Sequence, residues 1–289
     1  MQFKRWAVAA LGAAIGISAL PIRAGAQTTV LYNGAKDAGS DTPDSAAEGS
    51  WLEYTAGGGS PTVSSSGGAT TLNTTVGNAT PSPPAPPYSD EAGYSNYTPA
   101  GAMVNSPSPF PSLNPTPGFS VAFDVNVTSE FHSGTTRAGF DVIVLGSDKK
   151  GVELGFWEND VWAQEYSSGF TPDPSEDADT ENGASFASTF STAAATGNFH
   201  DYVLSIIGTN YSLTDDGATI LTGQTHDYMA SAMLPYTLAN YVFIGDDTTE
   251  AAADESFSLL SVTVPEPATA TGLLFVFSAA LGRRRRSMI

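Results

Sequence analysis

The stretch FSVAFDVNV, residues 119–127, alternates apolar with small or polar side chains. Phe119, Val121, Phe123, Val125 and Val127 occupy every second position. Successive side chains of an extended strand point to opposite faces, so this pattern predicts a strand with one buried and one wet face.

Other stretches of the chain repeat this period of two. Residues 200–207, HDYVLSII, alternate in the same way, and the shorter apolar runs 140–145 and 241–244 indicate central strands covered on both faces. The tripeptide DDG at 215–217 predicts a hairpin turn, and residues 256–264 predict a last strand. No stretch between the termini shows sustained helical periodicity with caps. The sequence therefore predicts an all-β domain.

The proline distribution interrupts this pattern. Eleven of the 19 prolines lie between Pro81 and Pro117. Proline cannot donate to a strand ladder, so residues 81–117 are expected to form a Pro-rich excursion, a long covering loop within one sandwich domain at 27–263. A linker between two domains is the alternative. It is disfavoured because residues 30–76 are too few and too rich in Gly and Ser for a core of their own.

The N-terminus has the three parts of a secretory signal peptide. Lys4 and Arg5 precede an apolar run at 6–20, and Ala24 and Ala26 are the small residues that a signal peptidase reads. Residues 1–26 are therefore predicted to be removed after Ala26. A retained membrane anchor is the alternative, but the apolar run is short for a span.

The C-terminus, residues 264–289, combines a Pro-Glu-Pro motif, an uncharged run at 268–282 and four arginines. The run is shorter than the roughly 20 residues of an ordinary span, but long arginine side chains can extend it. The positive-inside rule places the arginines in the cytoplasm and the rest of the chain outside. We expect a short transmembrane helix inserted transiently in the inner membrane. A buried core helix would have to accommodate four adjacent charges.

These C-terminal residues resemble the PEP-CTERM sorting signal of Gram-negative and related bacteria. The matching positions are Pro265, Glu266, Pro267 and the cluster Arg283, Arg284, Arg285 and Arg286. The resemblance implies that an exosortase, a membrane protease, cuts near the Pro-Glu-Pro motif. It also implies that the body reaches the cell surface or extracellular matrix. Two prolines keep the motif extended, which suits a protease beside the membrane.

Charge restricts the partners of the body. The chain has 11 basic and 30 acidic residues, and removing both ends leaves 29 acids against Lys36, Arg137, Lys149 and Lys150, a net charge of about −25. Without a basic patch to neutralise phosphates, nucleic-acid binding is excluded. The absence of cysteine excludes disulfides, thiolate catalysis and cysteine zinc sites.

A second resemblance covers residues 118–264. The blocks RAGFDVIVL (137–145), GVELGFWE (151–158) and YVFIGDD (241–247) are similar to concanavalin-like and laminin-G-like jelly rolls, including "choice-of-anchor" domains of exported bacterial proteins. This resemblance implies a two-sheet β-sandwich and, by analogy, carbohydrate binding to an extracellular polysaccharide. A fold alone does not establish a function.

Catalytic signatures are weak. Glu153 and Glu158 flank a tryptophan, but residues five apart in one strand point to opposite faces and cannot address one sugar unless a bulge intervenes. His132, His200 and His226 are scattered singly. No nucleophile elbow, P-loop or dinucleotide fingerprint occurs.

Asp246 and Asp247 follow an apolar run and form a candidate calcium site at the sheet rim; an acidic solvated loop is the alternative.

Together these patterns predict an exported, non-catalytic surface protein that is structural or lectin-like. The alternative is a secreted glycan-cleaving enzyme with a diverged site. The sequence does not identify ligand-binding residues.

Overall fold

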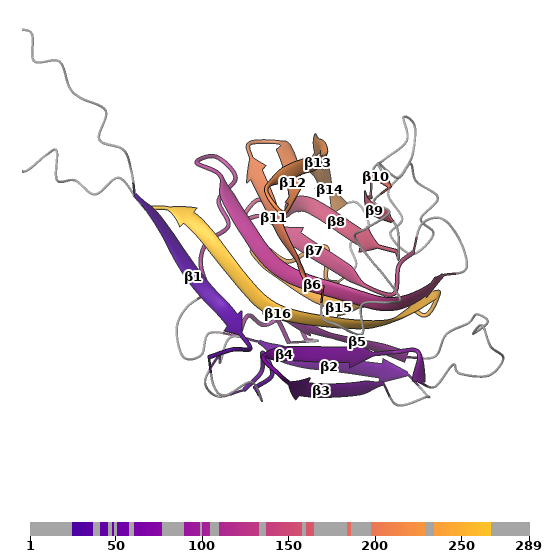
Figure 1. Cartoon of the computed structure of the whole chain (residues 1–289). Coiled ribbons are helices and arrows are strands. Elements are labelled where there is room, and N and C mark those ends of the chain that lie inside the picture. The colour runs from indigo at the N-terminus through magenta and orange to yellow at the C-terminus, as the bar shows by residue number, and fades with distance from the viewer. Residues whose placement is uncertain are drawn as a thin grey trace, which may run out of the picture. The chain divides into compact units, whose positions relative to one another are not determined.

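The computed structural model describes residues 25–36, 41–45, 48, 51–57, 61–76, 90–98, 100–104, 110–132, 137–157, 160–164, 184–185, 198–228 and 234–266. Their regular elements are strands, β1 to β16, which pair into two antiparallel sheets (Figure 1). Residues 26–266 form one compact unit. The all-β, two-sheet sandwich predicted from the alternation is confirmed.

The first sheet, sheet A, has β6 and β16 at its centre. Its strand order is β13 (Ala218–Gln224), β12 (Asn210–Asp215), β11 (His200–Ile207), β6 (Phe119–His132), β16 (Ala251–Pro265), β4 (Ala69–Asn73) and β3 (Thr62–Ser66), and β1 (Ala26–Asn33) also pairs with β16.

The second sheet, sheet B, has β7 and β15 at its centre. Its strand order is β10 (Ala184–Ser185), β9 (Asp160–Ala163), β8 (Lys150–Phe156), β7 (Asp141–Leu145), β15 (Tyr241–Asp246), β5 (Asp90–Ser95) and β2 (Leu52–Gly57), and β14 (His226–Asp227) pairs with β8.

The main hydrophobic core lies between the sheets. The alternating residues of β6 are buried as predicted, and Phe123 stacks on Tyr202 of sheet A with ring centroids 5.5 Å apart. Phe123 also meets Phe156 of sheet B edge to face at 5.9 Å. Both β7 and β15 are buried along their whole length, which confirms that they are central strands.

The chain passes repeatedly from one sheet to the other. Strands β4, β5, β6 and β7 belong in turn to sheets A, B, A and B, and β15 in sheet B leads to β16 in sheet A. This crossing pattern is that of a jelly-roll sandwich. The predicted hairpin joins β12 and β13, where Asp216 and Gly217 both have positive φ, as a type I′ turn requires.

The expectation that all of residues 81–117 form a loop is wrong for β5. Strand β5 pairs with β15 on one side and with β2 on the other. Its six residues, DEAGYS, contain no proline, so every backbone N–H is available to the ladder. The many prolines of residues 81–117 favoured a loop, although the six residues of β5 within this segment contain none.

The first and last strands bring the two ends of the body together. Ala26 is paired with Pro265, and β1 and β16 run side by side toward these ends (Figure 1). Residues 1–24 and 267–289, which include most of the predicted signal peptide and sorting tail, lie outside the described residues. Within the described part, no helix has the length and hydropathy needed to cross a membrane.

Candidate functional site

The outer face of sheet B, which points away from sheet A, carries the candidate site. In β7, Val142 and Val144 join the core between the sheets. Ile143 and Leu145 point the other way, and a second hydrophobic cluster packs over them. That cluster contains Ile143, Leu145, Tyr228, Tyr236, Tyr241 and Phe243.

Three carboxylates meet on this outer face. Asp141 begins β7, Glu153 lies in the middle of β8, and Asp247 directly follows β15. The ladder pairs Glu153 with Ile143 and Asp141 with Gly245, which brings the three side chains to one place. One oxygen of each lies within 4.8 Å of the others. We call these residues the acidic cluster.

Polar neighbours surround the acidic cluster. The Tyr236 hydroxyl donates a hydrogen bond of 2.5 Å to Oε2 of Glu153. The charge of Arg137 opposes the rise that burial causes in the pKa values of Asp141 and Asp247, and its Nε lies 3.5 Å from Oε2 of Glu250. The indole N–H of Trp157 donates to the carbonyl oxygen of Arg137 at 2.8 Å. These contacts position one guanidinium beside three acids.

Burial raises the pKa values of two members of the acidic cluster, Asp141 and Asp247. Asp141 is 2% exposed, and its burial, together with the charges of Asp247 and Glu153, holds its pKa well above the usual range. Burial also raises the pKa of Asp247 to about 6, although Arg137 opposes this shift. A hydrogen bond from Asp141 favours the ionised form of Asp247. With a pKa of about 6, Asp247 is therefore mostly ionised at neutral pH, whereas burial favours the protonated form of Asp141.

Two adjoining cavities, each of about 320 Å³, open beside the acidic cluster. They share Glu91, Leu234, Pro235 and Asp247, and we call them together the outer cleft. The acidic cavity is also lined by Arg137, Glu153, Tyr236, Thr248, Thr249 and Glu250. The aromatic cavity is also lined by Leu52, Glu53, Tyr54, Ser95, Tyr97, Thr98, Leu238, Tyr241 and Phe243. Their volumes suit small ligands or a few sugar units.

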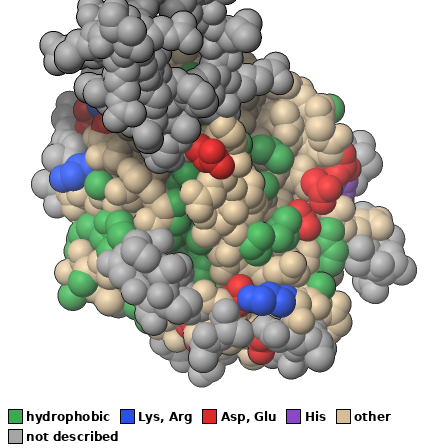
Figure 2. All heavy atoms as spheres, turned by 90° about the vertical axis from the view of Figure 1, so that its left-hand side faces the viewer, with side chains coloured by type: hydrophobic (Ala, Val, Ile, Leu, Met, Phe, Trp, Pro, Cys, Tyr) green, Lys and Arg blue, Asp and Glu red, His purple; other side chains and the backbone are tan. Residues whose placement is uncertain are grey.

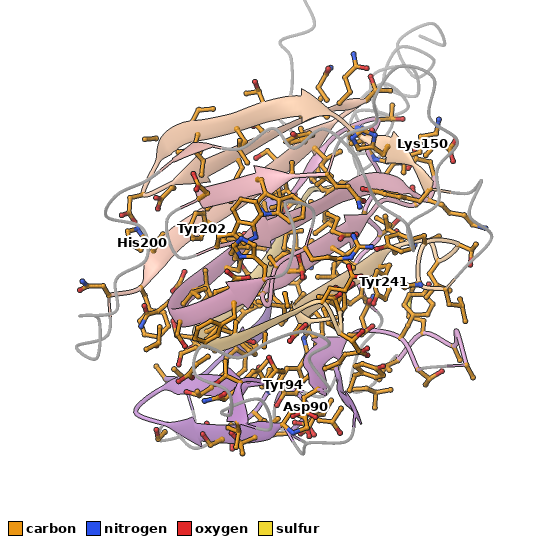
Figure 3. All side chains as sticks on the ribbon, turned by 90° about the vertical axis from the view of Figure 1, so that its right-hand side faces the viewer. Asp90, Tyr94, Lys150, His200, Tyr202 and Tyr241 are labelled. Atoms are coloured by element: carbon orange, nitrogen blue, oxygen red, sulfur yellow. The ribbon has the colours of Figure 1, made fainter. Side chains whose placement is uncertain are left out.

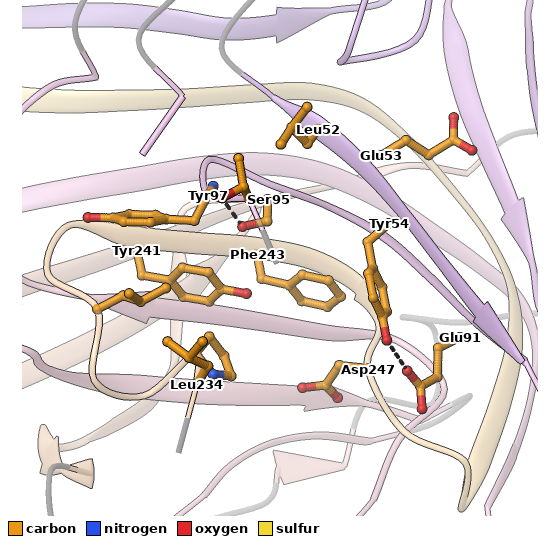
Figure 4. A pocket seen from close by; sticks show the side chains of 13 residues that line it. Leu52, Glu53, Tyr54, Glu91, Ser95, Tyr97, Leu234, Tyr241, Phe243 and Asp247 are labelled. Carbon is orange, nitrogen blue, oxygen red and sulfur yellow. Dashed lines mark hydrogen bonds between the residues drawn. The ribbon is translucent and has the colours of Figure 1, made fainter. Parts of the chain in front are cut away.

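The aromatic cavity has an ordered wall (Figure 4). Tyr54 of β2 donates a 2.6 Å hydrogen bond to Oε2 of Glu91 on β5. The Phe243 ring occupies the space above Gly93, where a Cβ would come within 2.5 Å of that ring. Tyr97 donates to the carbonyl oxygen of Ala239, which secures the adjoining loop. The wall thus presents rings and hydrogen-bonding groups side by side.

The two residues of the predicted calcium site, Asp246 and Asp247, point to opposite faces of sheet B. Asp246 continues the alternation of β15 toward the inside, where its Oδ2 accepts from Thr74 and its Oδ1 from the amide of Thr248. Asp247 instead joins the acidic cluster, so three acidic groups that could hold a metal ion do lie together. Whether calcium binds there stays a prediction.

The other residues singled out in the sequence lie elsewhere. His132 stacks on Trp157 with ring centroids 4.3 Å apart, and His226 lies in β14. His200 forms a separate group with Asp215 and Asp216, far from Tyr241 (Figure 3).

The structure describes only some of the residues that are predicted to direct processing of the chain. Ala26 and Pro265 are paired strand residues, and Glu266 follows β16. Glu158, Ala24, Pro267 and Arg283 to Arg286 lie outside the described residues.

The acidic cluster was missed because its members come from three strands far apart in the sequence. The alternation contained part of the signal. Asp141 and Glu153 both fall on the face opposite the buried valines of their strands, and Asp246 falls with inward-facing Ile244. Only the strand order of sheet B shows that β7 has β8 on one side and β15 on the other.

No protein-family model matches the chain, and no curated protein sequence matches it. A carbohydrate esterase from the Shiga toxin-encoding bacteriophage phi24B is similar in structure, with a TM-score of 0.48 and 10% identity over 83% of this chain and 100% of that chain. An endo-1,3-beta-glucanase from Streptomyces sioyaensis has a TM-score of 0.41 and 14% sequence identity. The match covers 75% of this chain and 90% of the glucanase chain. The Emp46p carbohydrate recognition domain, in a potassium-bound form, has a TM-score of 0.44 and 12% sequence identity. The match covers 82% of this chain and 97% of that domain's chain. Similarity at this level assigns no function.

Proposed function

We propose that this chain is an exported surface or matrix protein whose outer cleft binds a glycan without cleaving it. The observation that carries the proposal is the aromatic cavity, where Tyr54, Tyr97, Tyr241 and Phe243 lie beside carboxylate and hydroxyl groups. Sugars present both C–H faces and hydroxyl groups, so they fit a wall that combines rings with hydrogen-bonding groups.

Sorting through a PEP-CTERM pathway is the second part of the proposal. Signal peptidase and an exosortase would act during export, and the body would end at the cell surface or in the extracellular matrix. The support is the sequence of both ends together with the pairing of Ala26 with Pro265. If both cleavages occur as proposed, they would fall near the same end of the ladder between β1 and β16.

Glycan binding is tested by affinity electrophoresis of the purified protein through gels that contain individual polysaccharides. Replacing Tyr54 with alanine should weaken retardation by the bound polysaccharide about tenfold, because a ring and a hydroxyl leave the wall. Tyr54→Phe, which removes only the bond to Glu91, should retain part of the binding. Ile207→Ala, at a residue of sheet A that is 63% exposed, is the control. Equal retardation of all four proteins, or none for the unchanged protein, would contradict the proposal.

A glycan-cleaving enzyme is the second candidate, and one observation favours it. Glu153 and Asp247 line the same cavity, and oxygens of the two lie within 4.8 Å. This upper limit lies just below the roughly 5–5.5 Å between the two carboxyl groups of retaining glycosidases. Asp247, with its pKa of about 6, would be the general acid, and Glu153 the nucleophile. New reducing ends from any bound polysaccharide, lost in Glu153→Gln but retained in Asp216→Asn, would establish this alternative over binding alone.

Calcium binding is a separate proposal, now attached to Asp141, Glu153 and Asp247 instead of to Asp246. Three carboxylates so close together supply part of the six to eight oxygens that calcium prefers. The guanidinium of Arg137 beside these carboxylates opposes a bound cation, so the affinity for calcium should be modest.

A further inference from the structure

The basic residues of the body are few, and their positions are known. Between residues 27 and 266 the sequence contains only Lys36, Arg137, Lys149 and Lys150 as lysine or arginine. All four are described residues, so no other segment of the body can contribute a lysine or arginine to the outer cleft. On the face seen in Figure 2, acidic side chains (red) lie in several places among polar and apolar surface.

Of these four residues, only Arg137 lines the cleft. Nζ of Lys36 lies 3.5 Å from Glu48, and Nζ of Lys150 lies 3.2 Å from Asp227. Lys149 occupies the turn between β7 and β8, where its φ is positive. Arg137 alone lines the cleft, beside Glu250.

Carboxylates, by contrast, converge on the cleft. Glu91 and Asp247 lie at the junction of its two cavities, and Glu153 and Glu250 line the acidic cavity. Glu53 is not counted, because it pairs with inward-facing Tyr94 and its side chain points away from the cavity (Figure 4). Four carboxylates against one guanidinium give the cleft a clear negative charge. It therefore repels anionic ligands and attracts cations.

The junction has the geometry to hold a cationic group next to a sugar ring. Oε2 of Glu91 accepts from Tyr54, which orients the carboxylate and leaves its second oxygen able to accept another donor. Asp247 lies across the junction (Figure 4). An ammonium between them would form charge-assisted hydrogen bonds, and the rings of Tyr54 and Phe243 would add cation–π attraction.

We propose that the outer cleft selects glycans with free amino groups, such as polymers of glucosamine, over neutral glycans and over glycans with uronic acids. This proposal rests on the proposed function, because it names the class of sugar that the same cleft prefers. Acetylation of the amine removes its charge and two of its donors, so the N-acetylated polymer should behave as a neutral glycan.

The test is titration calorimetry of the purified protein with four β-1,4-linked oligosaccharides of equal length. They are built from glucosamine, N-acetylglucosamine, glucose and glucuronic acid, and the buffer has physiological salt and a pH close to 7, above the pKa of about 6 of Asp247. We expect the glucosamine oligomer to bind about tenfold or more tightly than the two neutral oligomers, and the glucuronic acid oligomer not to bind. Glu91→Gln should remove most of this preference.

The control for diffuse charge is Asp216→Asn, which changes the same charge at an exposed position in the β12–β13 turn. If Asp216→Asn reduces glucosamine binding as much as Glu91→Gln does, the attraction comes from the whole acidic surface and the proposal is wrong. If the neutral oligomers bind as tightly as the glucosamine oligomer, the selectivity is overturned while glycan binding stands. If no oligomer binds, both proposals fail.

Discussion

Ala26 lies opposite Pro265 in the antiparallel ladder between β1 and β16. Two residues further along, the hydroxyl groups of Thr28 and Thr263 are hydrogen-bonded at 2.8 Å. The N-terminal residues of the expected mature chain thus hold the segment that leads into the Pro-Glu-Pro motif. The first residue of β1 and the last residue of β16 therefore lie at the same end of this ladder.

The first prediction concerns processing at this end of the ladder. Protein released from the cell surface should begin at Gln27 and end near Pro265 to Pro267, because the proposed signal peptidase and exosortase would cut at these positions. Intact-mass spectrometry of the released protein measures both ends at once. A released form that retains Ile289 would contradict sorting through the tail.

The second prediction concerns the core. Phe123 is fully buried between Tyr202 and Phe156, so Phe123→Ala should lower the free energy of unfolding by about 3–5 kcal/mol. Val30→Ala, at a position that is 50% exposed, should change it by less than about 0.5 kcal/mol. Denaturant unfolding measures both. Similar small effects in the two variants would contradict the packing of β6 between the sheets.

The third prediction concerns pH. Burial raises the pKa of Asp124 from 3.8 to about 6, and Asp201 lies directly across the ladder from it. The folded chain binds this proton more tightly than the unfolded chain, so its stabilising effect is complete below the unfolded pKa and is lost as pH rises through about 6. Buried Asp246 and Glu255, whose pKa values are also raised, act in the same direction.

The melting temperature should therefore fall as pH rises from about 5 to about 7.5 at fixed ionic strength. Asp124→Asn should flatten this dependence, because an amide does not titrate. Stability that rises over this range in the unchanged protein would show that the ionised forms are favoured in the fold, contrary to the burial described here.

The fourth prediction concerns calcium. At fixed ionic strength, calcium should raise the melting temperature more than magnesium, because a ligand of the native state stabilises it and magnesium dehydrates reluctantly. Asp247→Asn should abolish the shift, while Asp246→Asn should retain it, since both Asp246 oxygens accept hydrogen bonds inside the protein. Equal responses to both ions in every variant would indicate only general screening.

Local sequence patterns are sufficient to predict several strands of the sandwich. Period-two alternation identifies the buried face of β6, continuous apolar runs identify β7 and β15 as central strands, and the DDG tripeptide identifies the turn at Asp216 and Gly217, because each depends on neighbours in sequence. Strand β5 was missed because the prolines around it dominate the composition of the window. The acidic cluster depends on strand order, which is set by packing across the sheet and cannot be seen in any single segment.

A crystal structure of the protein with a bound oligosaccharide would show whether the outer cleft of sheet B binds a glycan. We expect a sugar unit packed against Tyr54 and Tyr97 and hydrogen-bonded to Glu91 or Asp247. A sugar bound on sheet A, or at the separate group of His200, Asp215 and Asp216, with the outer cleft empty, would contradict it.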